Sequence, residues 1–519
     1  MATVQAIILA AGAGTRMKSE RPKVLHLLCG RPMIAYAIDL AAAAGVKQPI
    51  VVIGHGEEQL RPILPKEAKV VVQSKPQGTG DAVRLAKKSL GATGDVLILY
   101  ADTPLIRRTT IHKMIELHFK AGATGTLLTT HLADPSGYGR IQRNEVGQIT
   151  GVVEEADANA AQRAIREVNI GPVVCKIPAL SLVLAELKSS GATKEFYLTR
   201  LIGQLAQQDG AKIQSARTEE AAEALGVNSQ VELARAIGII RQRIIDAHLH
   251  NGVMIEDPQT TCIDQGVTIG HDTVIRPHTV IETGASIGRR CTIGPFARLR
   301  SGVALGDDVR VGNFADLVRT KVGARTRINH VSYLGDATLE EDVNIGAGTI
   351  TANYDGTAKH PTSIGKGAFI GSDTVLIAPV KVGAGAVTGA GSVVTKEHDV
   401  PAKGVVVGVP ARPMDGKMGT DRAPRVKVVE EPAHPARRVA AKAVTRPQPK
   451  RVKAKPKPKA KAAPRRASRR LKRRVIVKRR PARPSKRSRR AGARATSGRR
   501  GAGVRRFVRR LARRLAKRR

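Results

Sequence analysis

The sequence predicts an α/β domain with a mostly parallel sheet, followed by a left-handed parallel β-helix of hexapeptide repeats and a disordered basic tail. Three observations support this prediction. Short apolar runs alternate with helix-like segments over residues 1–228, aliphatic side chains recur at every sixth position over residues 263–317, and residues 432–519 contain no Asp or Glu. A chain of 519 residues has room for two or three such units.

The first predicted domain covers residues 1–228. Its short apolar runs have the length of strands and alternate with helix-like segments, as in a Rossmann-like sheet with helices on both faces. Ligands of such sheets bind in the loops at the carboxyl ends of the strands. We expect strands over Val4–Leu9, Ile50–Ile53, Val70–Val72 and Val96–Leu99, and helices over Met33–Ala44 and Asp81–Leu90.

A single helix over residues 229–250 is expected to link the two domains. Ser229 and Glu232 have the spacing of a capping box, which marks the first turn of a helix. Asn251-Gly252 marks its end, because these residues favour the conformation that follows a last helical turn.

The second predicted domain, residues 251–415, contains the strongest repeat in the sequence. In a parallel β-helix each coil stacks its aliphatic side chain on the next, and together they build a continuous core. The period alone says nothing about chemistry, so function has to be sought where the repeat is interrupted. Ten aliphatic residues at a spacing of six are Ile263, Ile269, Ile275, Ile281, Ile287, Ile293, Leu299, Leu305, Val311 and Leu317, and the pattern resumes at Val322, Ile328 and Leu334.

The net charge of +45 belongs mainly to the tail, residues 416–519. Residues 432–519 hold 38 of the 88 Lys and Arg, which leaves 50 against all 43 acidic residues in the rest of the chain. Such a segment buries too little apolar surface to fold alone. Nucleic acid or an anionic membrane would attract it non-specifically, with a basic amphipathic helix over residues 504–515; a solvated extension without a partner is the alternative.

The four cysteines predict a reducing compartment. Cys29, Cys175, Cys262 and Cys291 are widely spaced and form no CxxC pair. The first apolar run lacks a preceding basic segment, and no stretch of about 18 apolar residues occurs. We therefore expect a cytoplasmic protein.

The loop after the first expected strand is suited to phosphate binding. It reads Leu9-Ala10-Ala11-Gly12, has a second glycine at Gly14 and continues to Met17. Glycines let backbone N–H groups approach phosphate oxygens, and Arg16 and Lys23 add positive charge. No Gly-Lys-Ser/Thr follows, which excludes a P-loop, and a tight strand-to-helix turn is the alternative interpretation.

Several further motifs follow in the order typical of sugar-nucleotide pyrophosphorylases. They are LAAGAGTRM at residues 9–17, Arg21-Pro22-Lys23-Val24-Leu25, Gln73, Gln77-Gly78-Thr79-Gly80, Tyr100–Leu105, Gly137–Arg140, Glu154, Asn169 and Gly226-Val227-Asn228. Up to about residue 410 the chain resembles the family of bifunctional N-acetylglucosamine-1-phosphate uridyltransferases and glucosamine-1-phosphate acetyltransferases. The resemblance implies acetyl transfer from acetyl-CoA to glucosamine-1-phosphate, then Mg²⁺-dependent uridylyl transfer from UTP to N-acetylglucosamine-1-phosphate. The product, UDP-N-acetylglucosamine, is a precursor of peptidoglycan and lipopolysaccharide.

The resemblance assigns roles in the first site. Arg16 and Lys23 would act on the phosphates in catalysis, while Asp102 and Asn228 would bind Mg²⁺, a hard cation that prefers oxygen ligands. A turn-forming role for Asp102 and a helix-capping role for Asn228 are the alternatives. The nucleotide-binding residues would be Leu9, Ala10, Ala11, Gly12, Lys23, Gln73, Gly78 and Thr79, with the last three on uracil, and the sugar-binding residues would be Gly139, Glu154 and Asn169.

Polar interruptions of the repeat resemble the acetyltransferase half of that family. By this resemblance His330 is the general base that takes a proton from the attacking amine of glucosamine-1-phosphate, a task that suits an imidazole near neutral pH. A packed or surface histidine is the alternative. The sugar phosphate would be bound by Arg300, Tyr333, Asn344 and Lys359, and acetyl-CoA by Ala347, Asn353, Tyr354, Ser372 and Ala390, in a groove that in this family lies between neighbouring chains of a homotrimer.

Some positions depart from the family pattern. Val318 stands where a phosphate-binding Lys is usual, and Arg319 or Lys321 are candidate substitutes, although adjacent strand positions point to opposite faces. In the first site, Asp81, Ala156, Ile170 and Arg200 replace the residues that the family normally has. Two alternative functions therefore stay open. One is a uridylyltransferase whose β-helix is a trimerisation scaffold or acylates another sugar; the other is a polyanion-binding protein on an enzyme scaffold.

Overall fold

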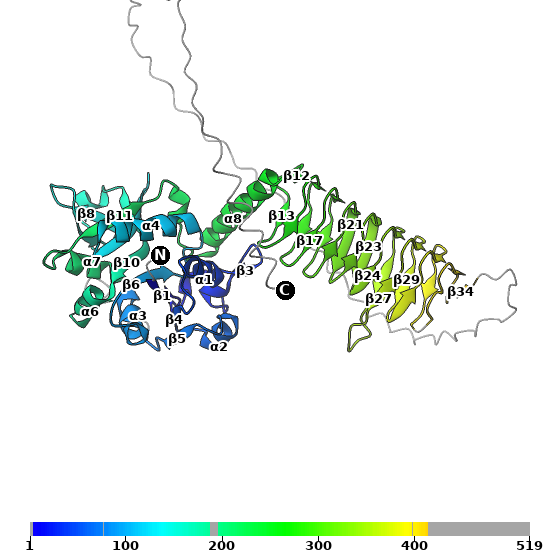
Figure 1. Cartoon of the computed structure of the whole chain (residues 1–519), viewed down its shortest axis with the longest axis horizontal. Coiled ribbons are helices and arrows are strands. Elements are labelled where there is room, and N and C mark those ends of the chain that lie inside the picture. Colours follow the sequence, from blue (N-terminus) through cyan, green and yellow to red (C-terminus); the bar gives the residue numbers. More distant parts are fainter. Residues whose placement is uncertain (1–3, 76, 187–195, 397, 414–519) are drawn as a thin grey trace, which may run out of the picture. The chain divides into compact units, whose positions relative to one another are not determined.

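The computed structural model describes residues 4–75, 77–186, 196–396 and 398–413 (Figure 1). The expected tail, residues 416–519, lies outside these described residues, and so do the last two positions of the expected second domain. Among the helices within the described ranges, none is long and apolar enough to cross a membrane.

A mixed sheet of nine strands forms the centre of the first part of the chain (Figure 1). Strands β6, β1, β4 and β5 run parallel to one another, and β11 runs parallel to β7, whereas β10 is antiparallel to both β6 and β7. The mostly parallel sheet predicted from the alternating pattern is thus confirmed. The strands are β1 (Val4–Leu9), β4 (Ile50–Ile53), β5 (Lys69–Val72), β6 (Asp95–Tyr100), β7 (Gly125–His131), β8 (Arg140–Arg143), β9 (Ile149–Val153), β10 (Glu167–Lys176) and β11 (Ile213–Arg217).

Helices cover both faces of this sheet. Ile8 packs in one apolar cluster with residues of α1 and α4, while its neighbour Ile7 packs in a second cluster with residues of α3, α6 and α7. Consecutive side chains of a strand point to opposite faces, so both faces are buried. The helices are α1 (Met33–Ala43), α2 (Glu57–Leu60), α3 (Thr79–Ala86), α4 (Arg108–Ala121), α5 (Ala160–Arg163), α6 (Ile177–Ala185) and α7 (Leu198–Ala206), with short 3₁₀ turns at Thr15–Met17, Lys23–Leu25, Arg61–Ile63, Lys87–Ser89 and Ala221–Ala224 and a small hairpin of β2 (Leu27–Leu28) and β3 (Arg31–Pro32).

Helix α8 (Gln230–His250) occupies the segment for which a linker helix was expected. The Ser229 hydroxyl accepts a hydrogen bond from the backbone N–H of Glu232. The Glu232 carboxylate accepts hydrogen bonds from the backbone N–H of Asn228 at 2.7 Å and from the hydroxyl of Ser229 at 3.2 Å. The first turn of α8 therefore also fixes the backbone of a predicted metal ligand.

The parallel β-helix begins at β12, and each strand pairs with an equivalent strand in the next coil (Figure 1). Cys262 is in register with Val280, a separation of one 18-residue coil. The predicted fold class is confirmed for this part as well. The strands are β12 (Met254–Ile255), β13 (Cys262–Ile263), β14 (Thr268–Ile269), β15 (Val274–Ile275), β16 (Val280–Ile281), β17 (Ser286–Ile287), β18 (Thr292–Ile293), β19 (Arg298–Leu299), β20 (Ala304–Leu305), β21 (Arg310–Val318), β22 (Lys321–Val322), β23 (Arg327–Gly335), β24 (Ala337–Leu339), β25 (Asn344–Ile345), β26 (Ile350–Ala352), β27 (Thr362–Ile364), β28 (Phe369–Ile370), β29 (Val375–Ile377), β30 (Val380–Val382), β31 (Val387–Thr388), β32 (Val393–Val394), β33 (Val405–Val407) and β34 (Arg412–Pro413).

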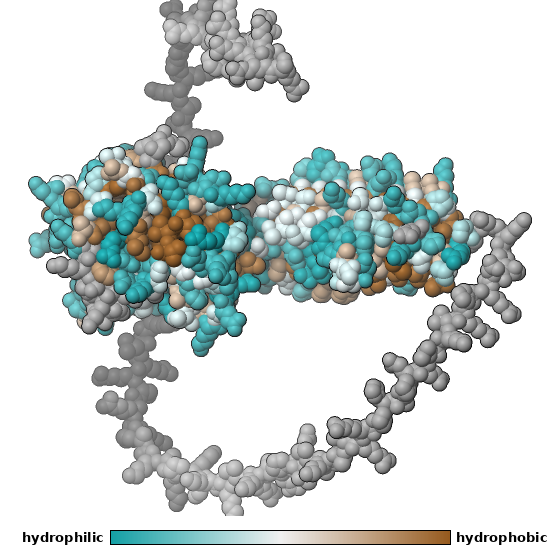
Figure 2. All heavy atoms as spheres, turned by 90° about the horizontal axis from the view of Figure 1, so that it is seen from below, coloured by the Kyte–Doolittle hydropathy of each residue, from teal (hydrophilic) through white to brown (hydrophobic). Residues whose placement is uncertain are grey.

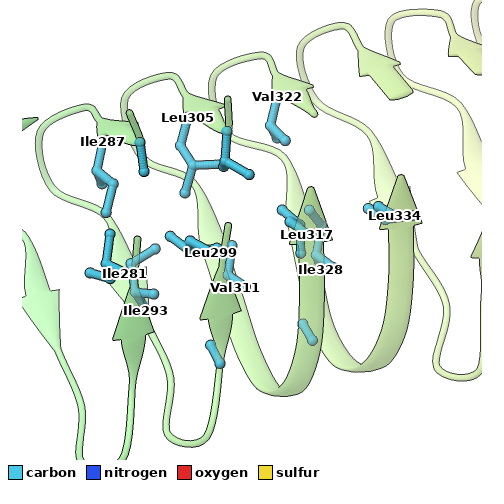
Figure 3. Close-up of a cluster of buried hydrophobic side chains, with 14 of the residues drawn as sticks. Ile281, Ile287, Ile293, Leu299, Leu305, Val311, Leu317, Val322, Ile328 and Leu334 are labelled. Atoms are coloured by element: carbon cyan, nitrogen blue, oxygen red, sulfur yellow. The ribbon is translucent and has the colours of Figure 1, made fainter. Parts of the chain in front are cut away.

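The hexad aliphatic residues form the core of the β-helix, as predicted. Figure 3 shows Ile281, Leu299 and Leu317 side by side in successive coils, and all three are fully buried. The repeat departs from its period in the coils that were expected to bind substrates. Arg310 pairs with Arg327, one residue fewer than a regular coil, and Ala337 pairs with Thr362, which inserts a loop over residues 353–361.

Candidate functional site

A cavity of about 260 Å³ lies where strands β1 and β6 end. All the residues expected to bind the nucleotide line it, namely Leu9, Ala10, Ala11, Gly12, Lys23, Gln73, Gly78 and Thr79. This placement follows from the parallel arrangement of the strands, whose carboxyl ends meet at one edge of the sheet. The fold therefore brings together side chains that are up to 70 positions apart in the sequence.

The glycine loop shapes one end of this cavity. Gly14 has a φ of +64°, and a Cβ atom there would lie 2.6 Å from the Cβ of Lys23, so the loop can fold over Lys23 only with glycine at this position. Around Gly12 there is open space for a ligand. Arg16 is exposed on the short turn that follows and has no hydrogen bond or ion pair within the described part of the chain. It is free to reach a ligand, although it does not line the cavity.

Lys23 lies between the two predicted metal ligands. Its ammonium donates to Asp102 Oδ2 at 2.5 Å and to Asn228 Oδ1 at 3.1 Å. A carboxylate oxygen and an amide oxygen thus converge on a single cation, and both are donors that Mg²⁺ accepts. The donor set therefore fits the metal that the sequence predicts.

Backbone contacts hold the two oxygen donors in place. The N–H of Val227 donates to the carbonyl of Asp102 at 2.8 Å, which joins the loop after β6 to the segment before α8. Asn228 is fixed in turn by the carboxylate of Glu232. Asn228 takes no part in capping α8, because the side chain of Ser229 already does so, and its own side chain stays available to the cation.

The three predicted sugar-binding residues lie close together. Asn169 N donates to the carbonyl of Gly139 at 2.9 Å. A Cβ atom at Gly139 would lie 3.5 Å from Glu154 Oε2 and 2.8 Å from a methyl group of Val152, so this approach requires glycine. Glu154 is oriented by the hydroxyl of Thr199, which donates to Oε1 at 2.6 Å.

Tyr100 connects the nucleotide and sugar regions and was not singled out from the sequence. It ends β6, lines the nucleotide cavity and interacts with Thr79. Burial, and then the negative charges of Glu154 and Asp102, raise the pKa of its hydroxyl. The neutral phenol is therefore a stable hydrogen-bond group at the centre of the site. Its position two residues before Asp102 at a strand end was the available sequence signal.

In the β-helix, His330 lies on the edge that also carries three of the predicted acetyl-CoA residues. Asp373 N donates to Ala347 O at 2.7 Å and Gly391 N donates to Ser372 O at 2.8 Å, so Ala347, Ser372 and Ala390 occupy equivalent corners of successive coils. Gly348 N donates to Val331 O at 2.7 Å, which places the neighbour of His330 in the same row.

The His330 ring borders a cavity of about 410 Å³ that Arg276 and Arg310 also line. His330 Nδ1 lies 3.1 Å from Asn313 Oδ1. When Nδ1 donates to this amide oxygen, Nε2 keeps its lone pair and can accept a proton. Asn344 belongs to this side of the coil, since its strand position is in register with Arg327 and, through it, with Arg310.

The other predicted sugar-phosphate residues form a separate cluster on the β-helix. Arg300 donates to Asp316 Oδ2 at 2.5 Å, and Asp316 is in register with Tyr333. Asn353 Nδ2 donates to Asp336 at 2.5 Å, and the positive charge of Lys359 helps to lower the pKa of Asp336, for which Arg319 is the largest cause. Among the described residues, no side-chain hydrogen bond links His330 to this cluster.

Three protein families match separate parts of the chain. Residues 6–161 match the MobA-like NTP transferase domain. Residues 279–313 match the hexapeptide repeat of succinyl-transferase, and residues 361–396 match the bacterial transferase hexapeptide of six repeats. The matched segments fall in the α/β part and in the β-helix.

Curated relatives cover most of the chain. The bifunctional protein GlmU of Rubrobacter xylanophilus is 42% identical over 441 residues, which span 78% of this chain and 93% of the relative. Those of Heliobacterium modesticaldum and Mycolicibacterium vanbaalenii are 41% and 39% identical, over 78% and 79% of this chain and 94% and 92% of the relatives. The chain belongs to the GlmU family.

Membership of the GlmU family confirms the expected enzyme, a bifunctional uridyltransferase and acetyltransferase of UDP-N-acetylglucosamine synthesis. A solved structure of UDP-glucose pyrophosphorylase with UDP-glucose is 19% identical to the chain, with a TM-score of 0.40, and covers 46% of this chain and 99% of that one.

The structure also shows what surrounds Val318, the position at which the resemblance predicts a phosphate-binding lysine. Val318 is buried. Arg319 forms an ion pair with Asp336, in which Nε donates to Oδ1 at 2.5 Å and a terminal nitrogen donates to Oδ2 at 2.7 Å. Lys321 belongs to β22, which pairs within a different sheet of the β-helix from the one that contains β21 and β23. Arg319 is thus already paired and Lys321 lies in another sheet, while the positive charge of Lys359 acts on Asp336.

Proposed function

We propose that the cavity at the ends of β1 and β6 transfers a uridylyl group from UTP to N-acetylglucosamine-1-phosphate. A phosphate oxygen of the sugar attacks the α-phosphorus of UTP, the bond between that phosphorus and the bridging oxygen breaks, and pyrophosphate leaves. Such a reaction needs aligned reactants and neutralised charge more than covalent help from the protein. The observation that carries this proposal is the convergence of Lys23, Asp102 and Asn228 on one point beside the glycine loop.

The residues of the cavity divide this work. Asp102 and Asn228 would hold Mg²⁺, which when bound neutralises phosphate charge and orients the α-phosphate. Lys23 and Arg16 supply positive charge to the phosphates, and the open space at Gly12 admits their approach to the backbone. Gln73, Gly78 and Thr79 bind uracil, while Gly139, Glu154 and Asn169 bind the sugar of N-acetylglucosamine-1-phosphate.

For the β-helix we propose acetyl transfer from acetyl-CoA to the amine of glucosamine-1-phosphate. The amine attacks the thioester carbonyl, a C–N bond forms, the C–S bond breaks and coenzyme A leaves as a thiol. His330 Nε2 takes the proton from the amine, and Asn313 orients the ring. Ala347, Asn353, Tyr354, Ser372 and Ala390 would bind acetyl-CoA, and Arg300, Tyr333, Asn344 and Lys359 would bind the sugar phosphate.

A homotrimer would complete this second site. In the family that the chain resembles, the acetyl-CoA groove lies between neighbouring chains, so groups from a neighbouring chain would add to the residues around His330. An exposed aromatic stack supports such an interface, because Phe296 and Phe314 stack at 5.4 Å between ring centroids and are 47% and 58% exposed. Figure 2 shows further hydrophobic surface, in brown, on the β-helix. Exposed apolar patches of this kind mark protein contacts.

Two assays on a single preparation test both assignments. Release of pyrophosphate from UTP and N-acetylglucosamine-1-phosphate reports the first reaction, and thiol release from acetyl-CoA with glucosamine-1-phosphate reports the second. Asp102→Ala should abolish only the first activity and His330→Ala only the second. Pyrophosphate release without thiol release by the unaltered chain would leave the β-helix as a scaffold or as an acyltransferase for another sugar.

The basic segment of residues 416–519 is proposed to bind polyanions such as nucleic acid or an anionic membrane non-specifically. Its support is the charge of residues 432–519, which hold 38 Lys and Arg without an acidic residue. Binding of this kind weakens steeply with salt because counterions are released. Heparin retention across a salt series should therefore be lost when residues 416–519 are deleted, and both enzyme activities should persist.

A further inference from the structure

The amide of Gln73 is held in one orientation inside the nucleotide cavity. Its Nε2 donates to the carbonyl of Gly78 at 3.2 Å and to Asp81 Oδ2 at 2.8 Å. A primary amide has two N–H donors, and both are used here by acceptors of the protein itself. No donor within the described residues bonds to Gln73 Oε1, so this oxygen is the atom of the amide that remains for a ligand of the cavity that Gln73 lines.

The side chain of Asp81 is also fixed by hydrogen bonds within the protein. It lies buried in the first turn of α3, and its second oxygen, Oδ1, accepts from Arg84 at 2.5 Å. Arg84 in turn stacks over the ring of Phe196, with its guanidinium carbon 5.1 Å from the ring centroid. Each oxygen of the carboxylate therefore has its own partner.

A carboxylate can only accept hydrogen bonds, which prevents the glutamine amide from turning over. The flipped amide would place Gln73 Oε1 against Asp81 Oδ2 and against the carbonyl of Gly78, and both hydrogen bonds would be lost. With an acceptor at both N–H groups, only one orientation of the Gln73 amide keeps its hydrogen bonds.

We propose that Asp81 is a positioning residue that makes the first site selective for uracil over cytosine by fixing the Gln73 amide. This inference rests on the proposed uridylyl transfer. With Oε1 turned to the ligand, the amide accepts a hydrogen bond from the N3–H of uracil. Cytosine presents a lone pair at N3, which would face the lone pairs of Oε1 and leave both groups unpaired. Sites that depend on one buried hydrogen bond reject ligands that lack the donor.

The test is a competition between UTP and CTP for N-acetylglucosamine-1-phosphate, with the two nucleotide-sugar products counted by mass spectrometry. In Asp81→Ala the amide is free to turn, and the ratio of UDP-sugar to CDP-sugar should fall by roughly tenfold or more, the usual range for one buried hydrogen bond. Asp81→Asn, which keeps one acceptor oxygen, should retain more of the selectivity than Asp81→Ala.

A double-variant cycle separates positioning from a general structural effect. If Asp81 acts through Gln73, Asp81→Ala should not change the product ratio further when Gln73→Ala is already present. Asp39→Asn is the matched control: this acid pairs with Arg31 at 2.7 Å outside the cavity and should leave the ratio unchanged. Thermal unfolding of each variant checks that it is folded.

Three results would overturn the proposal. They are an unchanged product ratio in folded Asp81→Ala, an equal loss of both products, or the same change in ratio with and without Gln73. If Asp81→Ala does not fold, Asp81→Asn and the comparison with Gln73→Ala decide the question. A wild-type enzyme that makes neither nucleotide sugar would instead show that the proposed uridylyl transfer is wrong.

Discussion

Lys23 contacts the two oxygens that we propose as ligands of Mg²⁺. Its ammonium bridges Asp102 and Asn228, with a side chain that is only 10% exposed. A lysine ammonium and Mg²⁺ cannot occupy the same point between two oxygens. If Asp102 and Asn228 bind Mg²⁺ as proposed, the Lys23 ammonium has to leave these two oxygens, and it is then available to the phosphates.

Replacing this lysine should separate metal binding from turnover. In Lys23→Met the two oxygens lose their internal cation, so the protein without nucleotide should bind Mn²⁺, a probe for Mg²⁺, more tightly than the wild type in an electron paramagnetic resonance titration. Pyrophosphate release should fall by roughly 100-fold or more, the typical effect of removing one group that stabilises transition-state charge. Lys69→Met, at an exposed lysine, should change neither measurement. Weaker Mn²⁺ binding in Lys23→Met would show that the ammonium does not compete with the metal.

We expect Lys359 to bind the phosphate of glucosamine-1-phosphate, because the apolar side chain of Val318 cannot do so. Its charge reaches Asp336 in the sugar-phosphate cluster, whereas Lys321 belongs to a different sheet. Lys359→Ala should raise the KM for glucosamine-1-phosphate by roughly tenfold, the effect of losing one charged contact. Lys321→Ala should leave this KM unchanged in the same thiol-release assay. An increase for Lys321→Ala alone would mean that Lys321 replaces the missing lysine after all.

At the scale of elements, the β-helix owes its stability to ladders of identical contacts. Ile263, Ile281, Leu299 and Leu317 are in register through four successive coils and are all almost fully buried. Because each coil contacts only its neighbours, a defect in one coil weakens the two interfaces beside it. Outward positions of the same strands do not add to this core.

Adjacent residues of β16 allow a direct test of this ladder. Ile281 is fully buried, while Val280 beside it is 36% exposed. Ile281→Ala should lower the free energy of unfolding by about 2–5 kcal/mol, because the substitution removes buried methyl groups and leaves a cavity. Val280→Ala should lower the free energy of unfolding by well under half of that amount. Urea unfolding followed by the β-structure signal measures both, and equal losses would contradict a core built only from the inward positions.

At the scale of the whole molecule, the sequence best predicted those elements whose packing requires apolar residues at a regular spacing. The hexad of Ile263 to Leu317 predicted the β-helix because every coil must bury the same position, and β1 was predicted with its observed bounds. The antiparallel β10 was not predicted, since strand direction depends on contacts distant in sequence. Tyr100 was missed for a related reason: a single strand-end tyrosine becomes part of a site only when the fold brings Thr79 and Glu154 to it.

The residues predicted to bind the nucleotide came from the resemblance of several motifs in order, and all of them line one cavity. The hydrogen bond between Gln73 and Asp81 could not be anticipated, because the two residues lie eight positions apart on different elements. Likewise, the pairing of Arg319 with Asp336 depends on coil stacking and becomes visible only in three dimensions.

Buried histidines should make the stability of the α/β part depend on pH. His118 of α4 is 1% exposed and lies between Thr126 Oγ1 at 2.9 Å and Asp95 Oδ1 at 3.0 Å. Burial lowers the pKa of its imidazole below the ordinary value of 6.5, although Asp95 opposes this shift. As pH falls through 6.5, the unfolded chain takes up a proton on this side chain before the folded chain does. The free energy of unfolding must therefore fall with pH in this window.

Removing the imidazole should flatten this dependence. We expect His118→Gln to lose less stability than the wild type between pH 7.5 and pH 5.5, with slopes that differ by at most about 1.4 kcal/mol per pH unit, the limit for one proton. Urea unfolding at several pH values measures the slopes. A steeper slope in His118→Gln would mean that the ion pair with Asp95 outweighs burial, because a raised pKa would make acid stabilise the folded chain.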